Sequence, residues 1–241
     1  MKENSKNWDD LESIRDYLDN ANIIIQDRKT LLFILKIFYQ KYIFDGKPKK
    51  ILDLGTGNGI LIKTLIQNSS IENEIRVVDG SDIMIREAQS NLNYLSKVRY
   101  YKLDFQEIIN NGFPEKDFDF IVSSFAIHHL ELEKKREFYK IIFNLLRSNG
   151  YFINIDTTTS KFNDYTRWYL DLWSEWIKNY QIENNTDTSY EDIPYSASNS
   201  HENHYDPLTI QLDYLKKIGF SHVECFYKFG LFSIFGGKKI I

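Results

Sequence analysis

The feature that most constrains the fold is a regular alternation of short apolar segments and helical segments between residues 49 and 156. The apolar segments are short enough to be buried strands, and the segments between them carry apolar residues at helical spacing. Strands are expected at 49–54, 74–79, 98–103, 118–123 and 151–156, and helices at 60–67, 81–95 and 132–146. This α/β pattern is typical of a doubly wound, mostly parallel sheet with helices on both faces.

The rest of the chain is expected to add three parts to one domain. Residues 1–48 are predicted as an N-terminal helical cap, and residues 49–156 as the core that contains the sheet. Residues 157–205 are predicted as an insertion or lid over the core, because the strand–helix rhythm breaks there. Residues 206–241 are predicted to complete the core.

Within these parts, helices are expected over 8–44, with a break near Asn20 and Asn22, and over 161–180, which is rich in aromatic residues. Residues 183–205 are polar and are expected to form a loop. A helix is expected at 208–218, followed by an antiparallel edge hairpin of strands at 222–227 and 231–235. The sheet would then have seven strands.

Composition and charge exclude several classes of protein. The 241 residues include 30 Lys and Arg against 34 Asp and Glu, and this net charge of −4 disfavours a basic grip on DNA. Cys225 is the one cysteine, so neither a disulfide framework within the chain nor a thiolate zinc site can form. The polar start and the short apolar stretch at 31–38 match neither a signal peptide nor a membrane span. We therefore expect a cytoplasmic protein without membrane association.

A glycine-rich loop at 53–59, Asp-Leu-Gly-Thr-Gly-Asn-Gly, follows the first expected strand and precedes a helix. A dinucleotide-binding loop has G-x-G-x-x-G spacing, with pyrophosphate at the helix N-terminus. Here the third glycine is Gly59 and the next residue is Ile60, so the spacing is wrong. The carboxylate of Asp53, two residues before Gly55, would repel a pyrophosphate and would suit an amine or a sulfonium cation.

Two further acids end the second and third expected strands. Asp79 is placed where an acid can accept hydrogen bonds from both hydroxyls of a ribose. Asp104 could accept a hydrogen bond from the exocyclic amine of an adenine, or could be a helix N-cap. With Asp53, these acids lie at the carboxyl ends of parallel strands, where open α/β sheets bind ligands.

These motifs occur in the order found in one enzyme family. The segment 51–59 resembles the first motif of class I S-adenosylmethionine-dependent methyltransferases, 78–84 resembles their second-strand motif, and 103–105 resembles the third. The segments 118–130 and 146–151 are similar to the fourth motif and to the loop before the fifth strand. The resemblance implies a Rossmann-like fold, S-adenosyl-L-methionine as cofactor and S-adenosyl-L-homocysteine as product.

The resemblance also implies that the core, 49–156, is the cofactor-binding unit, and it gives a role to each residue that matches a motif. Gly55 and Gly57 would line the methionine part of the cofactor, and Asp53 would hold its amino group. Asp79 would take the ribose hydroxyls. The other implied cofactor contacts are Thr56, Asn58, Gly80, Met84, Asp104, Phe105 and Ser123.

On the substrate side, His128 follows the fourth expected strand, beside the expected position of the methyl group. It could act as a general base or orient a substrate, and a packed or solvated histidine is the alternative. The aromatic helix 161–180 must be partly core, and Trp168 and Tyr169 are its candidate substrate contacts. Tyr205 lies where the chain re-enters the core and is a candidate to close over the pocket.

The cap contributes two more candidate substrate contacts, Tyr17 and Arg28. Arg28 could bind a carboxylate of the substrate or the cofactor, with a surface salt bridge as the alternative. The run of residues 201–204, His-Glu-Asn-His, has no further His or Cys near it in the sequence, so we expect no metal site.

The leading interpretation is a methyltransferase that moves a methyl group to an O or N atom of a small molecule by in-line displacement. One alternative is a cofactor-modifying or tRNA wobble-uridine enzyme related to carboxy-S-adenosylmethionine synthase. A second is a non-catalytic adenosylmethionine-binding protein. A nicotinamide oxidoreductase is disfavoured by Asp53, and residues 123–126 lack the motif of DNA amino-methyltransferases. The edge strand and the aromatic insertion permit a homodimer.

Overall fold

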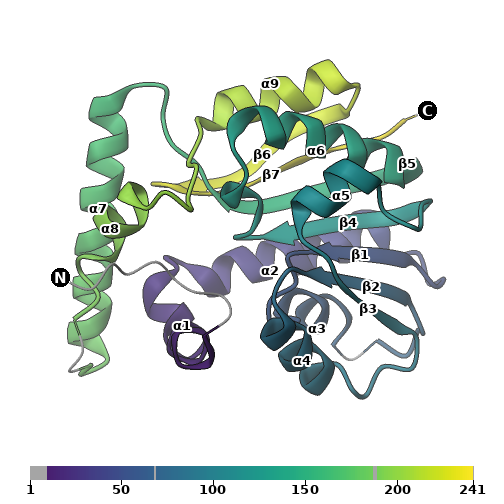
Figure 1. The fold of residues 1–241 in the computed structure, drawn as a ribbon, viewed down its shortest axis with the longest axis horizontal. Helices are drawn as coiled ribbons and strands as arrows, with labels where there is room; N and C mark the ends of the chain where they lie inside the picture. The colour runs from purple at the N-terminus through teal and green to yellow at the C-terminus, as the bar shows by residue number, and fades with distance from the viewer. Residues whose placement is uncertain (1–9, 68, 187–188, 241) are drawn as a thin grey trace.

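The computed structural model describes residues 10–67, 69–186 and 189–240, and Figure 1 shows a sheet covered by helices on both faces. The sheet has seven strands in the order β3-β2-β1-β4-β5-β7-β6. They are β1 (Lys50–Leu54), β2 (Glu74–Asp79), β3 (Val98–Lys102), β4 (Phe118–Ser124), β5 (Leu146–Thr157), β6 (Ser221–Phe229) and β7 (Phe232–Lys238). The predicted doubly wound, Rossmann-like α/β sheet is confirmed.

The strands β1 to β5 run parallel, and the last two strands form an antiparallel edge. β1 pairs with β2 and β4, β2 pairs with β3, and β4 pairs with β5, all in parallel. β7 pairs antiparallel with β5 and β6, as the predicted hairpin requires. The strand order reverses between β1 and β4, so the loops that follow these two strands diverge and open a crevice at the sheet edge.

The helices form two layers, one on each face of the sheet, plus a group at one end. They are α1 (Leu11–Ile24), α2 (Arg28–Phe38), α3 (Ile60–Ile66), α4 (Asp82–Asn91), α5 (Phe105–Asn111), α6 (Leu132–Leu145), α7 (Asn163–Glu183), α8 (Ile193–Asn199) and α9 (Leu208–Ile218). Because side chains alternate along a strand, Ile51 packs in the apolar cluster with α2 and α3, whereas Leu52 packs in the cluster with α6 and α9. Each face of β1 therefore belongs to a different core.

Some predicted boundaries are wrong. α1 continues through Asn20 and Asn22, and the side-chain amide of Asn20 bonds to the Asp16 carbonyl one turn earlier. The helix break comes later, at Asp27, whose φ of 52° is left-handed. β5 begins at Leu146 instead of residue 151, because Leu146 already pairs with Phe118 of β4.

Two short helices were not expected. α5 begins with a capping box, in which the carboxylates of Asp104 and Glu107 each bond the backbone N–H of the other. α8 lies within the segment predicted as a polar loop and has Pro194 in its first turn. Both helices have seven residues, too few to show a clear apolar period.

Helices α1, α7 and α8 gather beyond one end of the sheet, on the left of Figure 1. The Trp173 indole of α7 donates a hydrogen bond of 2.7 Å to the Ile24 carbonyl at the end of α1. The Tyr190 hydroxyl, from the segment before α8, donates to the Asp16 carboxylate of α1 at 3.3 Å. The cap helix and the 157–205 segment are thus bonded to each other. Among the helices of the described ranges, none combines the length and the apolarity needed to cross a bilayer.

Candidate functional site

The loop after β1 is shaped by glycines that have two different physical reasons to be glycine. Gly55 has a φ of 70°, and a Cβ built on it would lie 2.2 Å from the Cβ of Ala126. Gly57 has a φ of 54°, but a Cβ on it would meet nothing within 4 Å. Gly59 caps α3 at a φ of 80° and lies against Leu92. The loop therefore needs left-handed backbone at three positions and close approach of another loop at Gly55.

Replacing Gly55 by Ala is expected to destabilise the fold by about 2–5 kcal/mol, since strain of about 1–2 kcal/mol adds to a clash of about 1–3 kcal/mol. Gly57→Ala is the matched control, because it carries the same left-handed strain without the clash. It is expected to cost about 1–2 kcal/mol. Urea unfolding of the two variants measures the difference, and equal losses would contradict the close approach to Ala126.

Asp53, at the end of β1, is fully buried under this loop. Its Oδ2 accepts a hydrogen bond of 2.7 Å from the Thr56 hydroxyl, while its Oδ1 is buried without a partner among the described residues. Burial, and to a smaller degree the charge of Asp79, raises the pKa of Asp53 to about 7. A carboxyl in this state becomes ionised readily when a cation arrives.

The raised pKa of Asp53 predicts a stability that depends on pH. Between about pH 4 and pH 7 the folded state keeps a proton that the unfolded chain has lost, so stability falls as pH rises through this window and is level above it. Asp53→Asn cannot ionise, so its stability relative to the wild type should rise by about 4 kcal/mol between pH 4 and pH 8. Thermal unfolding without ligand measures this. Asp82→Asn, at an exposed position of α4, should show no such trend, and a parallel pH trend in both variants would contradict it.

Asp79 links the glycine loop to the start of α4. Its Oδ2 accepts a hydrogen bond of 2.8 Å from the Gly57 N–H, and its Oδ1 accepts one of 2.9 Å from the Ser81 N–H. Burial raises the pKa of Asp79, although these backbone donors and the N–H of Gly80 favour its charged form. The carboxylate thus fixes the loop backbone at the same edge as Asp53.

Three other predicted cofactor contacts lie around this loop, and their side chains already bond or pack within the protein. Asp104 is the exposed N-cap of α5, which is the alternative role weighed for it. The Phe105 ring packs on Phe138 and would be 3.3 Å from a Cβ at Gly55. The Ser123 side chain is fully buried, and its hydroxyl bonds to the Leu54 carbonyl, so this side chain is not available to a ligand.

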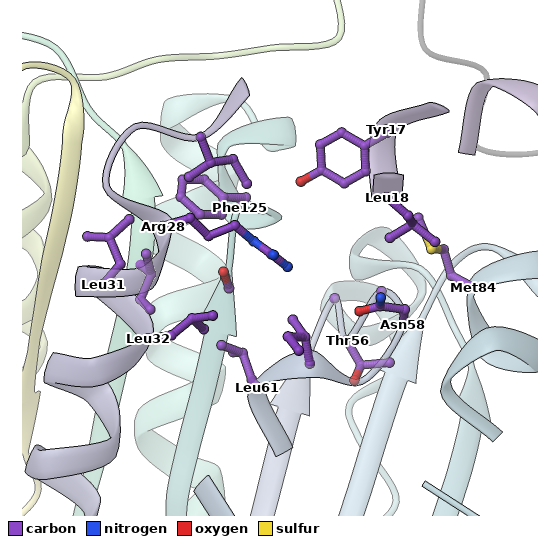
Figure 2. A pocket seen from close by; sticks show the side chains of 16 residues that line it. Tyr17, Leu18, Arg28, Leu31, Leu32, Thr56, Asn58, Leu61, Met84 and Phe125 are labelled. Atoms are coloured by element: carbon purple, nitrogen blue, oxygen red, sulfur yellow. The ribbon is translucent and has the colours of Figure 1, made fainter. Parts of the chain in front are cut away.

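A cavity lies between the glycine loop and the cap, and we call it the loop cavity (Figure 2). Its lining comes from α1, α2, the glycine loop, α4 and the end of β4, and includes Tyr17, Arg28, Gly55, Thr56, Gly57, Asn58, Met84, Ser124 and Phe125. Figure 2 shows the Arg28 side chain extending past Phe125 toward the space above Thr56. The enclosed part measures about 60 Å³, so a whole nucleoside ligand must also occupy the open side of the loop.

Arg28 is half-buried and forms no ion pair with the described residues. Its guanidinium donates a hydrogen bond of 3.1 Å to the Asn22 side chain. Burial lowers its pKa, although the nearby Tyr17 opposes this shift. A half-buried guanidinium without a carboxylate partner among the described residues is well suited to a carboxylate on a ligand.

A second, larger cavity of about 450 Å³ lies between the sheet edge, α1, α7 and the segment around α8, and we call it the lid cavity. It shares Tyr17, Ile25 and Phe125 with the loop cavity, so the two cavities meet at these side chains. Its lining also includes His128, His129, Trp173, Tyr190 and Tyr205. The volume is ample for a small organic molecule.

His128 lies in the short 3-10 turn Ile127–His129 after β4 and is 7% exposed. Its Nδ1 lies 2.6 Å from the Oδ1 of Asp156, a fully buried residue of β5. Burial alone would raise the pKa of Asp156, but the neighbouring His128 and Lys135 more than offset this and hold it below its usual value. An ionised Asp156 fixes Nδ1 as the protonated nitrogen, which leaves Nε2 to accept a proton.

Asp156 is a site residue that the sequence reasoning missed. It stands 28 positions from His128 and is held further by the Thr157 N–H and the Asn154 amide. The one available signal was an acid at the carboxyl end of the fifth expected strand, in the same row as Asp53 and Asp79.

The segment before α9 closes over the two histidines. The His204 N–H donates to the His128 carbonyl at 2.8 Å, and the Nδ1 of His129 lies 2.9 Å from the Glu202 carbonyl. Lys135, which is buried, pairs with Asp206 just beyond. These contacts place the Tyr205 ring edge-on to His128, with centroids 5.3 Å apart.

The two aromatic residues predicted as substrate contacts on α7 lie elsewhere. Trp168 is 57% exposed and packs beside Tyr169, whose ring lies under the Lys228 ammonium. Neither lines the loop cavity or the lid cavity. Trp173, between one and two turns further along α7, lines the lid cavity instead. Which ring faces the cavity depends on where the helix begins, because side-chain direction follows the helical period. The predicted start at residue 161 differs from the observed start at Asn163, so the prediction did not identify Trp173.

The residues of the glycine loop fit the implied cofactor in shape and charge. The buried Oδ1 of Asp53 lacks a partner, and an ammonium or a bridging water would satisfy it. The missing side chain at Gly57 leaves backbone open to a ligand, and Arg28, which lines the loop cavity, offers a counterion for a carboxylate. Arg28 in the cavity and the buried carboxyl of Asp53 under the loop thus suit the two ionised groups of an amino acid.

Comparisons with known proteins give the same assignment. Residues 51–150 match the family described as a methyltransferase domain. The carboxy-S-adenosyl-L-methionine synthase of Helicobacter pylori (strain J99) is 23% identical over 210 residues, which are 86% of this chain and 82% of that protein.

Solved structures share the fold. A protein of Methanococcus maripaludis assigned to the S-adenosyl-L-methionine-dependent methyltransferases has a TM-score of 0.64 at 19% identity, covering 100% of this chain and 98% of its own. The structure of PigF with SAH has a TM-score of 0.62 at 17% identity and covers 96% of this chain, which spans 60% of PigF. The family match covers the strands that carry the glycine loop, and this part of the chain, residues 51–150, belongs to the class I S-adenosylmethionine-dependent methyltransferases.

Proposed function

We propose that this methyltransferase moves a methyl group from S-adenosylmethionine to an O or N atom of a small molecule. The observation that carries the proposal is the meeting of the loop cavity and the lid cavity at Tyr17, Ile25 and Phe125. One cavity suits the cofactor and the other holds His128. The cofactor, when bound, supplies a methyl group on a positively charged sulfur, and its loss to the acceptor leaves S-adenosylhomocysteine.

On the cofactor side, Asp53 and Arg28 would hold the amino and carboxylate groups of the methionine part. Asp79 would take the ribose hydroxyls while it keeps the loop backbone in place. Met84 lines the loop cavity and would pack on the adenine, and Asn58 would border it. The remaining predicted contacts, Thr56, Gly80, Asp104, Phe105 and Ser123, surround the same loop.

On the substrate side, His128 would accept the proton that the acceptor atom loses, and Asp156 would position its ring. Tyr17 and Tyr205 would close the space around the acceptor, which excludes water from the reacting atoms. Trp168 and Tyr169 stay predictions of substrate contact that would need α7 to turn or shift.

Calorimetric titration with S-adenosylmethionine, S-adenosylhomocysteine and NAD tests the cofactor assignment. We expect micromolar affinity for both adenosyl-sulfur ligands and no measurable binding of NAD. Binding of NAD alone, or of none of the three, would overturn the proposal.

A second candidate is synthesis of a carboxylated cofactor, which the similarity to carboxy-S-adenosyl-L-methionine synthases favours. In that case a carboxylate would enter beside Arg28, which is the one Lys or Arg among the described residues that line the two cavities. Mass spectrometry of the cofactor after incubation separates the two candidates. A carboxylated product would favour the synthase, and S-adenosylhomocysteine with a methylated small molecule would favour methyl transfer.

A further inference from the structure

The lid cavity has a strongly one-sided charge. Asp16, Asp192 and Glu202 line it from α1, from the residue before α8 and from the segment after α8. All three are exposed at its rim, where carboxylates are charged at neutral pH. Within the described ranges, no Lys or Arg lines this cavity. A ligand that enters it therefore meets three carboxylates and, from the described residues, no Lys or Arg.

The interior of the lid cavity is aromatic. Six rings line it, from Tyr17, Phe125, Trp173, Tyr190, Tyr205 and Phe232. Aromatic faces carry partial negative charge and attract cations within about 6 Å of the ring centre. The rings also provide apolar surface for the body of a ligand, so they add to the preference that the rim acids set.

Two cationic side chains described above lie outside the lining of the lid cavity. Lys135 pairs with Asp206 and bonds to the His204 carbonyl. Arg28 lines the loop cavity and not the lid cavity. Behind His128, Asp156 adds a fourth carboxylate to the wall. The field inside the lid cavity is therefore negative from the rim to the histidine.

We infer that the methyl acceptor is a small organic amine, bound as its cation, with an apolar or aromatic body that the rings of the lid cavity enclose. If the amine nitrogen itself receives the methyl group, it first gives a proton to Nε2 of His128, because an ammonium has no lone pair for the attack. This rests on the proposed function and deepens it. A carboxylate or a phosphate among the rim acids would bring like charges together, and no Lys or Arg among the described lining residues offsets their repulsion. The same argument disfavours RNA, whose backbone would bring phosphates to this rim.

A set of matched compounds tests this inference. Each framework is offered as an amine, as the neutral alcohol and as the carboxylate, for example tyramine, 4-hydroxyphenylethanol and 4-hydroxyphenylacetate within a wider panel. Affinity for the protein saturated with S-adenosylhomocysteine is measured by titration of tryptophan fluorescence, since Trp173 lines the lid cavity. Across the panel we expect the amines to bind at least about tenfold tighter than the alcohols, and the carboxylates to bind weakest.

The variant Asp16→Asn/Asp192→Asn/Glu202→Gln removes the three rim charges and should bring the amine preference close to unity. The matched control, Asp19→Asn/Glu183→Gln/Glu191→Gln, changes the net charge equally at exposed residues outside the lid cavity and should keep the preference. Tighter binding of carboxylates, or a preference that survives removal of the rim acids, would overturn the inference. Titration of S-adenosylhomocysteine itself is the separate readout, and its failure would overturn the proposed function instead.

Discussion

Replacing His128 by Gln is expected to lower kcat for methyl transfer by roughly 10²–10⁴-fold, with cofactor affinity unchanged. The imidazole lines the lid cavity, and its Nδ1 is held by the buried carboxylate of Asp156 at 2.6 Å. Gln can neither accept the proton at Nε2 nor carry the positive charge that follows. The measurement is steady-state release of S-adenosylhomocysteine with an acceptor found by screening, beside calorimetry of cofactor binding.

Asp156→Asn should lower kcat by about 10² or more, because a neutral amide no longer favours the charged imidazole or fixes its tautomer. The KM for the acceptor should change little, since Asp156 is fully buried and cannot touch it. His129→Gln is the comparison variant, with an expected loss below about tenfold, because its ring bonds to the Glu202 carbonyl and not to a buried acid. A kcat for His128→Gln within about threefold of the wild type would contradict the base role.

Asp79→Ala is expected to weaken binding of S-adenosylmethionine by about 100-fold or more. The carboxylate accepts hydrogen bonds from the N–H groups of Gly57 and Ser81, so its loss frees the loop backbone as well as the proposed contact to the ribose. The proposed contact comprises two charge-assisted hydrogen bonds from the ribose hydroxyls to Asp79. At about 1.5–3 kcal/mol each, their loss corresponds to at least about 100-fold in affinity. Circular dichroism confirms that the variant is folded.

Asp82→Asn is the control for Asp79→Ala. It removes an exposed carboxylate on α4, three residues from Asp79, so it should leave cofactor affinity within about twofold. An Asp79→Ala variant that is folded and binds as tightly as Asp82→Asn would remove this residue from the site.

Much of the fold could be predicted because burial and period agree along the chain. The short apolar run that identifies β1 as a buried strand from the sequence is also what fills both cores, with Ile51 in one and Leu52 in the other. The break between the cap helices was predicted too early, near Asn20. The side-chain amide of Asn20 donates a hydrogen bond to the Asp16 carbonyl one turn earlier, so this residue continues the helix. The residues Asp104 and Glu107 have the spacing of a capping box, which is a sequence signal for the start of α5. The prediction covers only the N-cap role of Asp104 and therefore misses the helix.

The candidate site was predictable where it depends on one strand end and its loop. Asp53, Asp79 and the glycines between them lie together because parallel strands end at the same edge. The pairing of His128 with Asp156 depends instead on a single turn of 3-10 helix after β4, which sets the direction of the ring. The lid cavity depends on contacts such as Tyr190 to Asp16, between residues 174 positions apart, which no local pattern encodes.

The central claim is that the chain transfers a methyl group to a small molecule. Its most direct test is incubation of the protein with S-adenosylmethionine labelled on the methyl group and a fractionated pool of small molecules, followed by mass spectrometry. We predict that the label moves to a small amine while S-adenosylhomocysteine forms in equal amount, and that His128→Gln slows both by roughly 10²–10⁴-fold. Label that stays on the cofactor, moves to RNA, or remains on a carboxylated cofactor would contradict the account.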